Sequence, residues 1–144
     1  MPAVKDFMTS NVIIIDAQKT VLEAAKLMYQ QGVGDLVIME GNMPKGIVTE
    51  RDLVRRVMAQ KRSLEITVSG IMSTPLITIE EDASLREAAR KMVKNQIRRL
   101  PVIKKDQLVG IIATSDFARH LSKKTLTEEI LEAMSRYPFA DANR

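Results

Sequence analysis

The sequence contains no cysteine and no tryptophan, and aromatic residues make up only 3% of its 144 residues. Without cysteine the chain can form neither disulfides nor thiolate metal sites. The single histidine, His120, provides too few imidazole ligands for a transition-metal site, so we expect no bound metal. No serine or threonine has an adjacent histidine to activate it, and we therefore expect a protein that is not an enzyme.

Long hydrophobic runs are also missing. The longest aliphatic run covers residues 12–15, which is far too short to cross a bilayer. The first residues carry charges at Lys5 and Asp6 and lack the apolar segment of a secretion signal. We therefore expect a soluble cytoplasmic protein without a membrane partner.

The charge balance is basic, with a formal net charge of +4. Such an excess raises the alternative of a nucleic-acid-binding module, because lysine and arginine neutralise phosphates. The basic residues are interspersed along the chain in pairs such as Arg98-Arg99 and Lys104-Lys105, and aromatic residues for base stacking are nearly absent. This pattern favours an ordinary solvated surface over a nucleic-acid interface.

The chain repeats itself at a fixed offset. Adding 64 to the number of each residue from 4 to 57 gives its counterpart in residues 68–121 without a gap, and Met8, Met28 and Asp52 meet Met72, Met92 and Asp116. Two copies of one unit are the simplest explanation. The repeat predicts a first domain at residues 1–60, a linker at 61–67, a second domain at 68–122, and a C-terminal helix and tail at 123–144.

Each copy predicts the order strand, helix, strand, strand, helix. Capping boxes at Thr20-x-x-Glu23 and Ser84-x-x-Glu87 mark the start of the first helix of each copy. A third box, Thr125-x-x-Glu128, predicts a further helix to about Met134. Pro101 lies within a predicted strand, which indicates an edge strand or a strand start. The predicted strands are residues 12–15, 36–39, 46–48, 76–79, 100–103 and 108–112, and the predicted second helices are 49–59 and 114–121.

Two related stretches, residues 46–52 and 110–116, each run from an apolar strand into a helix start. Their glycines permit close backbone approach, and their hydroxyl and carboxylate groups stand where helix N–H groups lack partners. That arrangement suits a ribose and a phosphate. It equally fits a capping box with no further role, and the sequence alone leaves both interpretations open for Asp52.

The order of these motifs identifies a resemblance. Met8-Thr9 and Met72-Ser73 before the first strands, Arg98-Arg99-Leu100-Pro101-Val102 in the middle, and Gly-Ile-Val-Thr-Glu-Arg-Asp at residues 46–52 resemble a tandem pair of CBS domains, the module named after cystathionine β-synthase. The resemblance covers nearly all of residues 4–121. It implies an α/β (α+β) fold of two βαββα units, packed sheet to sheet with pseudo-twofold symmetry into a Bateman module, with clefts between them for adenosyl compounds.

The resemblance also implies a set of site residues. The aspartate of each repeated motif would bind ribose hydroxyls, the threonine and a basic residue three before the proline would meet the phosphate, and the first strand would line the base. By position, one cleft takes Val12, Ile13, Gly34, Ile47, Thr49 and Asp52 with Arg98 or Arg99 reaching across, and the other takes Leu76, Ile77, Arg98, Ile111, Thr114, Ser115 and Asp116 with Arg51 reaching across.

The two copies depart from the family pattern differently. Ala113 stands where the first copy has Thr49, so that hydroxyl is missing unless Thr114 or Ser115 replaces it. The first copy has Gly34-Asp35 where the second has Arg98-Arg99, and Asp35 would repel a phosphate. We therefore expect two clefts that are not equivalent.

The expected function is that of a stand-alone regulatory module. It would bind AMP, ADP, ATP or a related adenosyl compound as a regulatory ligand, require no cofactor, form a homodimer, and signal to an effector protein that the sequence does not name. The alternatives are a nucleic-acid-binding module and a structural adaptor without a ligand.

Overall fold

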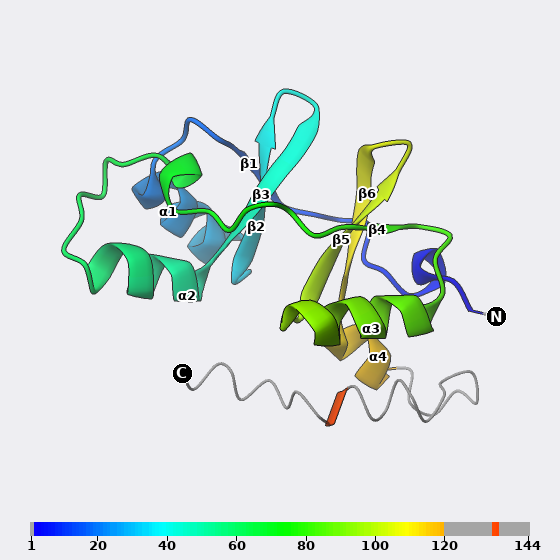
Figure 1. Cartoon of the computed structure of the whole chain (residues 1–144). Helices are drawn as coiled ribbons and strands as arrows, with labels where there is room; N and C mark the ends of the chain where they lie inside the picture. The colour runs from blue at the N-terminus through cyan, green and yellow to red at the C-terminus, as the bar shows by residue number, and fades with distance from the viewer. Residues whose placement is uncertain (1, 120–133, 136–144) are drawn as a thin grey trace. The chain divides into compact units, whose positions relative to one another are not determined.

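The computed structural model describes residues 2–119 and 134–135, which belong to two compact units (Figure 1). The central unit is Val12–Ile77, and the split unit combines Met1–Asn11 with Thr78–Arg144. Each unit contains a three-stranded sheet, so the expected mixed α/β fold is confirmed. His120 and most of the helix predicted from Thr125 lie outside the described residues.

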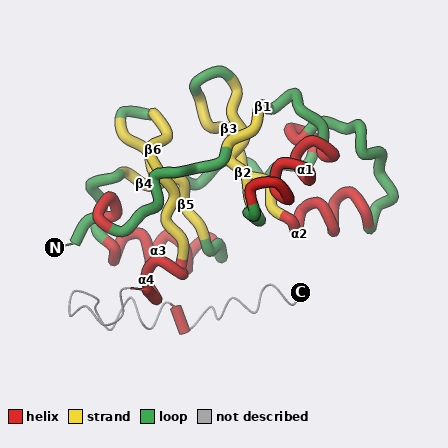
Figure 2. The backbone as a smooth tube through the Cα atoms, turned by 180° about the vertical axis from the view of Figure 1, so that it is seen from behind, coloured by secondary structure: helices red, strands yellow, loops and turns green. Residues whose placement is uncertain are grey.

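The central unit begins with the strand β1 (Ile14–Asp16), which is followed by the helix α1 (Val21–Gln31). Its sheet has the order β1-β2-β3, with β2 (Asp35–Glu40) parallel to β1 and antiparallel to β3 (Met43–Thr49). The helix α2 (Glu50–Asp52) follows β3, and Figures 1 and 2 show α1 and α2 beside each other at this sheet. The junction between β3 and α2 is where the sequence placed the ligand motif.

The helix α1 forms as its local sequence predicts. The hydroxyl of Thr20 accepts a hydrogen bond from the Glu23 amide at 3.1 Å, and the Glu23 carboxylate accepts one from the Thr20 amide at 3.1 Å. The helix ends at Gly32, whose φ of 65° lies in the left-handed region that glycine adopts without strain. The capping box predicted from the sequence is therefore confirmed at both of its bonds.

The core of the central unit lies between its sheet and its helices. It includes buried side chains from all three strands, from α1, and from two later segments, the π-helix η2 (Leu53–Met58) and the 3-10 helix η3 (Val68–Gly70). Burying aliphatic side chains of this kind stabilises a fold by roughly 1.5–3 kcal/mol each. The buried residues of this core are Ile15, Ala17, Val21, Ala24, Met28, Leu36, Ile38, Val48, Val57, Val68 and Ile71.

The split unit repeats this plan with strand order β4-β5-β6. A 3-10 helix, η1 (Val4–Asp6), comes from the N-terminal segment, and the rest comes from the second half of the chain. The later elements are β4 (Ile79–Glu80), α3 (Leu85–Asn95), β5 (Arg99–Lys104), β6 (Gln107–Ala113) and α4 (Thr114–Arg119). Ser84 caps α3, because its hydroxyl accepts a hydrogen bond from the Glu87 amide at 3.0 Å.

The expectation for Pro101 is wrong, since this residue lies inside β5, the middle strand of its sheet. The central unit shows why a proline is tolerated there. The Val37 amide donates to the Ile13 carbonyl at 3.2 Å, and Pro101, the counterpart of Val37, has no N–H to make that bond. Accordingly, β4 begins at Ile79, one residue later in the repeat than β1, and Pro101 pairs only with β6.

The helix predicted at residues 49–59 is only partly α-helical. After the short α2, the chain continues as the π-helix η2, and the Ala59 amide donates to the Val54 carbonyl at 2.8 Å, five residues earlier. Helical spacing of apolar residues does not distinguish these two hydrogen-bond patterns. The strand predicted at residues 12–15 also begins later, at Ile14, so that Val12 and Ile13 precede it.

The compact units are out of phase with the sequence repeat. Val68 opens the second repeat but is fully buried in the core of the central unit. Its counterpart Val4 opens the first repeat but belongs to the split unit, where its amide donates to the Ala83 carbonyl at 2.8 Å. The leading segment of each repeat therefore completes the unit that contains the other repeat's sheet.

The leading segments cross the last strand of each sheet at a glycine. In the central unit the Ser73 amide donates to the Ile47 carbonyl at 3.1 Å beside Gly46. In the split unit Thr9 and Ile111 exchange two backbone hydrogen bonds, both 2.9 Å long. A Cβ at Gly46 would lie 2.6 Å from the Met72 sulfur, and the contacts of Gly110 are equally close. These glycines therefore leave room for the backbone of the crossing segments.

An exposed ion pair also attaches the N-terminal segment to the split unit. The Lys5 ammonium lies 2.9 Å from an Asp82 carboxylate oxygen, in the loop before α3. The hydrogen bond and charge of this pair lower the pKa of Asp82 and raise the pKa of Lys5. Because both groups are solvated, the pair contributes little to stability compared with the burial of Val4.

The exchange of leading segments predicts which fragments fold. A fragment of residues 12–77 contains the whole central core, whereas a fragment of residues 1–60 lacks the buried Val68 and Ile71. We expect the 12–77 fragment to unfold cooperatively in urea, as monitored by circular dichroism. The 1–60 fragment should show no cooperative unfolding. Cooperative unfolding of the 1–60 fragment alone would contradict this division of the chain.

The crossings predict a cost for any side chain at the two glycines. Gly46→Ala and Gly110→Ala should each lower the free energy of unfolding by about 1–3 kcal/mol, because the crossing segment must shift. Gly70→Ala is the matched control, since a Cβ there meets nothing nearer than the Thr67 hydroxyl at 4.0 Å. Urea denaturation of the full chain measures all three, and equal stability of the three variants would contradict the close crossing.

Candidate functional site

The junction of β3 and α2 carries a complete capping box. The Thr49 hydroxyl accepts a hydrogen bond from the Asp52 amide at 3.1 Å, and one oxygen of the Asp52 carboxylate accepts from the Thr49 amide at 2.9 Å. The capping interpretation of this motif is therefore confirmed. The same bonds fix the direction of the carboxylate, so the box also orients the group that the ligand interpretation requires.

The second oxygen of Asp52 faces an arginine that the sequence analysis did not select. The Arg56 Nε atom lies 3.6 Å from this oxygen, and Arg56 Nη1 donates to the Ile71 carbonyl at 2.8 Å and to the Met72 carbonyl at 3.4 Å. The spacing of four residues between Asp52 and Arg56 is a recognised helical ion-pair signal and could have indicated the pair. The contact with the leading segment has no such local signal.

Strand register gathers the predicted residues of the central unit. Thr49 pairs with Asp35 across β2 and β3, and Ile47 pairs with Val37. The Val37 amide in turn donates to the Ile13 carbonyl. Ile13, Ile47, Thr49 and Asp52 therefore lie along neighbouring positions of one sheet and the helix that leaves it.

Gly34 completes this group from the chain that enters β2. Its carbonyl accepts a hydrogen bond from the Glu50 amide at 2.9 Å. A Cβ on Gly34 would lie 2.6 Å from a carboxylate oxygen of Glu50, so the glycine leaves room for this acidic side chain. The junction of the central unit thus carries the carboxylates of Asp35, Glu50 and Asp52 with the Arg56 guanidinium beside Asp52, and its excess of carboxylates disfavours an anion.

The junction of the split unit has the same backbone but different side chains. An oxygen of the Asp116 carboxylate accepts from the Ala113 amide at 2.7 Å, and Ala113 has no hydroxyl to return the bond. Asp116 is only 3% exposed. Only one of the two capping-box bonds is therefore present at this junction. The Asp52 and Asp116 carboxylates are thus held in different ways.

At this second junction Arg99 replaces Asp35, Arg98 replaces Gly34, and Thr114 replaces Glu50. Arg99 pairs with Ala113 in the register that Asp35 and Thr49 occupy in the other sheet. The Arg98 carbonyl accepts from the Thr114 amide at 3.0 Å, where Gly34 and Glu50 make the equivalent bond. The charge beside the second motif is therefore reversed.

The structure gives positions for several predicted site residues but does not bring them together in one site. Leu76 and Ile77 end the central unit, whereas Ile111 and Asp116 belong to the split unit. Their assignment to one cleft stays a prediction, as does the reach of Arg51, Arg98 or Arg99 across to the other half. Arg51 and Ser115 lie in the first turns of α2 and α4, and Val12 precedes Ile13 before β1.

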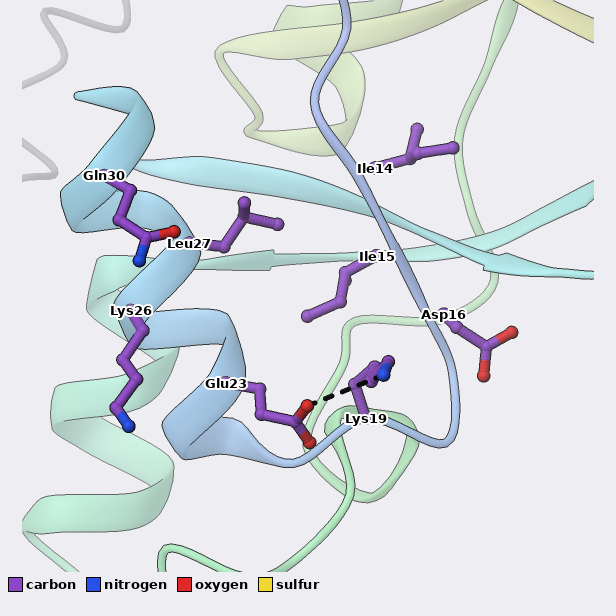
Figure 3. Close-up of a pocket in the computed structure, with 8 residues that line it drawn as sticks. All are labelled: Ile14, Ile15, Asp16, Lys19, Glu23, Lys26, Leu27 and Gln30. Atoms are coloured by element: carbon purple, nitrogen blue, oxygen red, sulfur yellow. Dashed lines mark ion pairs between the residues drawn. The ribbon is translucent and has the colours of Figure 1, made fainter.

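A depression of about 410 Å³ on the central unit lies apart from these residues (Figure 3). It opens between β1 and α1, and Figure 3 shows Ile15 and Leu27 beside it with the Lys19–Glu23 ion pair at one end. None of the predicted site residues lines it. Its lining carries two lysines and two carboxylates, Asp16 and Glu23, so it has no strong preference for ligand charge.

Within residues 2–119 and 134–135, no three His, Cys, Asp or Glu side chains are placed to hold a metal ion. No helix in the same residues has the length and apolar composition needed to cross a membrane.

The chain is similar to known proteins. The CBS domain family model matches residues 4–59 and 68–123. The CBS domain-containing protein YhcV of Bacillus subtilis (strain 168) is 42% identical over 118 residues, which cover 82% of this chain and 84% of YhcV.

Two solved structures are similar to the whole described fold. One is Hypoxic Response Protein I with two coordinated zinc ions, at a TM-score of 0.76 and 30% identity, covering 83% of this chain and 99% of that one. The other is the CBS domain pair of protein MJ0100 in complex with 5'-methylthioadenosine and S-adenosyl-L-methionine, at a TM-score of 0.76 and 29% identity, covering 87% and 99%. The chain therefore belongs to the CBS-domain family and carries two CBS domains in tandem.

Proposed function

We propose that the chain is a regulatory module that binds adenosyl compounds. The observation that carries this proposal is the recurrence of an oriented carboxylate, Asp52 or Asp116, at equivalent strand-to-helix junctions. The related CBS domain pair of MJ0100, which binds 5'-methylthioadenosine and S-adenosyl-L-methionine, supports an adenosyl ligand for this pair as well.

The residues at the central junction suit the parts of a nucleoside. A carboxylate accepts hydrogen bonds from both hydroxyls of a ribose, and such charge-assisted bonds are among the stronger ones in proteins. The cap bond from the Thr49 amide holds Asp52 in place before any ligand arrives. Ile13 and Ile47, which are half-buried, offer apolar surface to an adenine ring.

The two junctions should differ in the ligand that they prefer. Arg98 and Arg99 supply cations for a phosphate beside Asp116, which favours AMP, ADP or ATP at that half-site. Asp35 and Glu50 beside Asp52 favour an adenosyl compound with less negative charge. We propose that ligand binding is read by an effector protein, which would respond to the change that the ligand causes in the module.

These assignments predict unequal effects of removing the two carboxylates. Asp52→Ala and Asp116→Ala should each weaken nucleotide binding by roughly 10- to 100-fold, the value of lost hydrogen bonds to a charged group. Asp116→Ala should weaken the binding of AMP more than that of methylthioadenosine. Asp52→Ala should weaken the binding of methylthioadenosine more than that of AMP. Isothermal titration calorimetry measures both ligands, with Glu65→Ala as an exposed carboxylate control in the same chain.

Equal losses for the two variants would contradict the asymmetry of the half-sites. Nucleotide binding that is saturable but unaffected by either substitution would overturn the proposed site. Binding of RNA or DNA that weakens steeply with salt, without nucleotide binding, would instead identify the nucleic-acid module. A protein that binds none of these would be a structural adaptor.

We also propose a homodimer formed through the helices of the central unit. Tyr29 on α1 is 89% exposed, and Val54 and Met58 on η2 are 54% and 68% exposed. Val54 and Met58 lie four residues apart on one helical segment, so they present a common apolar surface. An apolar surface formed by neighbouring exposed side chains would be covered in an assembly.

Light scattering coupled to size exclusion tests the dimer. The wild-type chain should have about twice its monomer mass of 16.2 kDa, and Met58→Glu should shift it to the monomer. Met43→Glu is the control, because Met43 is also exposed but is the first residue of β3 and not part of a helix. A wild-type monomer, or dissociation by the control alone, would contradict the proposed surface.

A further inference from the structure

We propose that Arg56 is a positioning residue that couples ligand binding at Asp52 to the leading segment at Ile71 and Met72. This inference rests on the proposed function, since it assigns the regulation of the same half-site. Arg56 would act through Asp52 and through the backbone of the segment, without touching the ligand.

The two oxygens of Asp52 have different partners. The Thr49 amide donates to one at 2.9 Å, and the Arg56 guanidinium lies 3.6 Å from the other. The Asp52 side chain is only 12% exposed, whereas that of Arg56 is 47% exposed, so the pair is screened by water mainly on the arginine side. Together the two partners hold the carboxylate plane in one orientation.

The same guanidinium also holds the leading segment. Its Nη1 atom donates to the Ile71 carbonyl at 2.8 Å and is 3.4 Å from the Met72 carbonyl. Because a guanidinium is planar with donors fixed in a fork, its orientation toward the carbonyls and toward Asp52 cannot change independently. A movement of the carboxylate is therefore transmitted to these carbonyls.

The segment on the other side of this contact is also constrained. Ile71 is 2% exposed within the central core, and the next residues cross β3, where the Ser73 amide donates to the Ile47 carbonyl. Met72 packs against Gly46 at this crossing. From there the chain runs on to β4 of the split unit, so the segment is one of the two covalent connections between the units, the other being at Asn11–Val12.

The local backbone at Arg56 is unusual in a way that agrees with a functional role. Arg56 lies within the π-helix η2, and π-helical turns are rare and often occur at functional sites. Its neighbour Arg55 carries the same charge on the same helix and is also exposed. Arg55 therefore provides a matched control for charge and helix position.

Thermodynamic linkage fixes the sign of the coupling. If Arg56 holds Asp52 in the orientation that binds a ribose diol, then a bound diol stabilises the bonds from Arg56 to the segment by the same factor. Ligand binding should therefore slow amide hydrogen exchange at Met72 and Ser73. Without the guanidinium, this protection should be lost.

Nucleoside discrimination provides the first test. Calorimetry compares adenosine with 2',3'-dideoxyadenosine, which lacks the diol, for the wild-type chain, Arg56→Gln, Arg56→Lys and Arg55→Gln. Arg56→Gln should weaken adenosine binding about tenfold, the value of one charge-assisted interaction, and leave the dideoxy compound unchanged. Arg56→Lys should recover part of the loss, and Arg55→Gln should match the wild type. Equal losses for both nucleosides would indicate a structural role and overturn the inference.

Exchange measurements on the ligand-free protein provide the second test. Arg56→Gln and Asp52→Asn should each accelerate exchange at Met72 and Ser73 several-fold, and the double variant should exchange no faster than the single ones. Additive effects would overturn the coupling between Asp52 and Arg56. Absence of adenosine binding by the wild-type chain would overturn the proposed function, so the failures of the two proposals are distinguishable.

Discussion

Backbone crossings at Gly46 and Gly110 determine how this chain is divided. At each crossing a segment from outside the local sheet lies against the last strand, so close that a Cβ on the glycine would overlap it. The hydrogen bonds that join Ser73 to Ile47, and Thr9 to Ile111, then fix the segment in place. The burial of the apolar residues just before each crossing follows from this contact, and so does the composition of each compact unit.

Local signals in the sequence predicted local structure well. The capping boxes at Thr20 and Ser84 involve residues three apart, and both helices begin where those boxes place them. The exchange of leading segments could not be predicted in this way, because it joins residues far apart in the chain. Pro101 shows the same limit, since its place in a middle strand depends on how short the neighbouring β4 is.

The same distinction between local signals and contacts that depend on packing applies to the candidate site. The bonds between Thr49 and Asp52 follow from a motif that is visible in the sequence, and both are present. The position of the Glu50 side chain beside Gly34 depends on a packing contact. The bond from Arg56 to the Ile71 carbonyl depends on the leading segment. Reasoning from the motif identified the carboxylate and its Thr49 cap, but not the Glu50 and Arg56 side chains near them.

The exchanged segments also order the events of folding during synthesis. The central unit has all of its residues once the chain has been made as far as Ile77. The split unit uses Val4 from the N-terminal segment and Phe117 from α4, directly after the second sheet. Since domains fold as units while the chain emerges, the N-terminal segment stays without its partner strands until the central unit is already complete. The N-terminal segment is therefore synthesised before the central unit but buried after it.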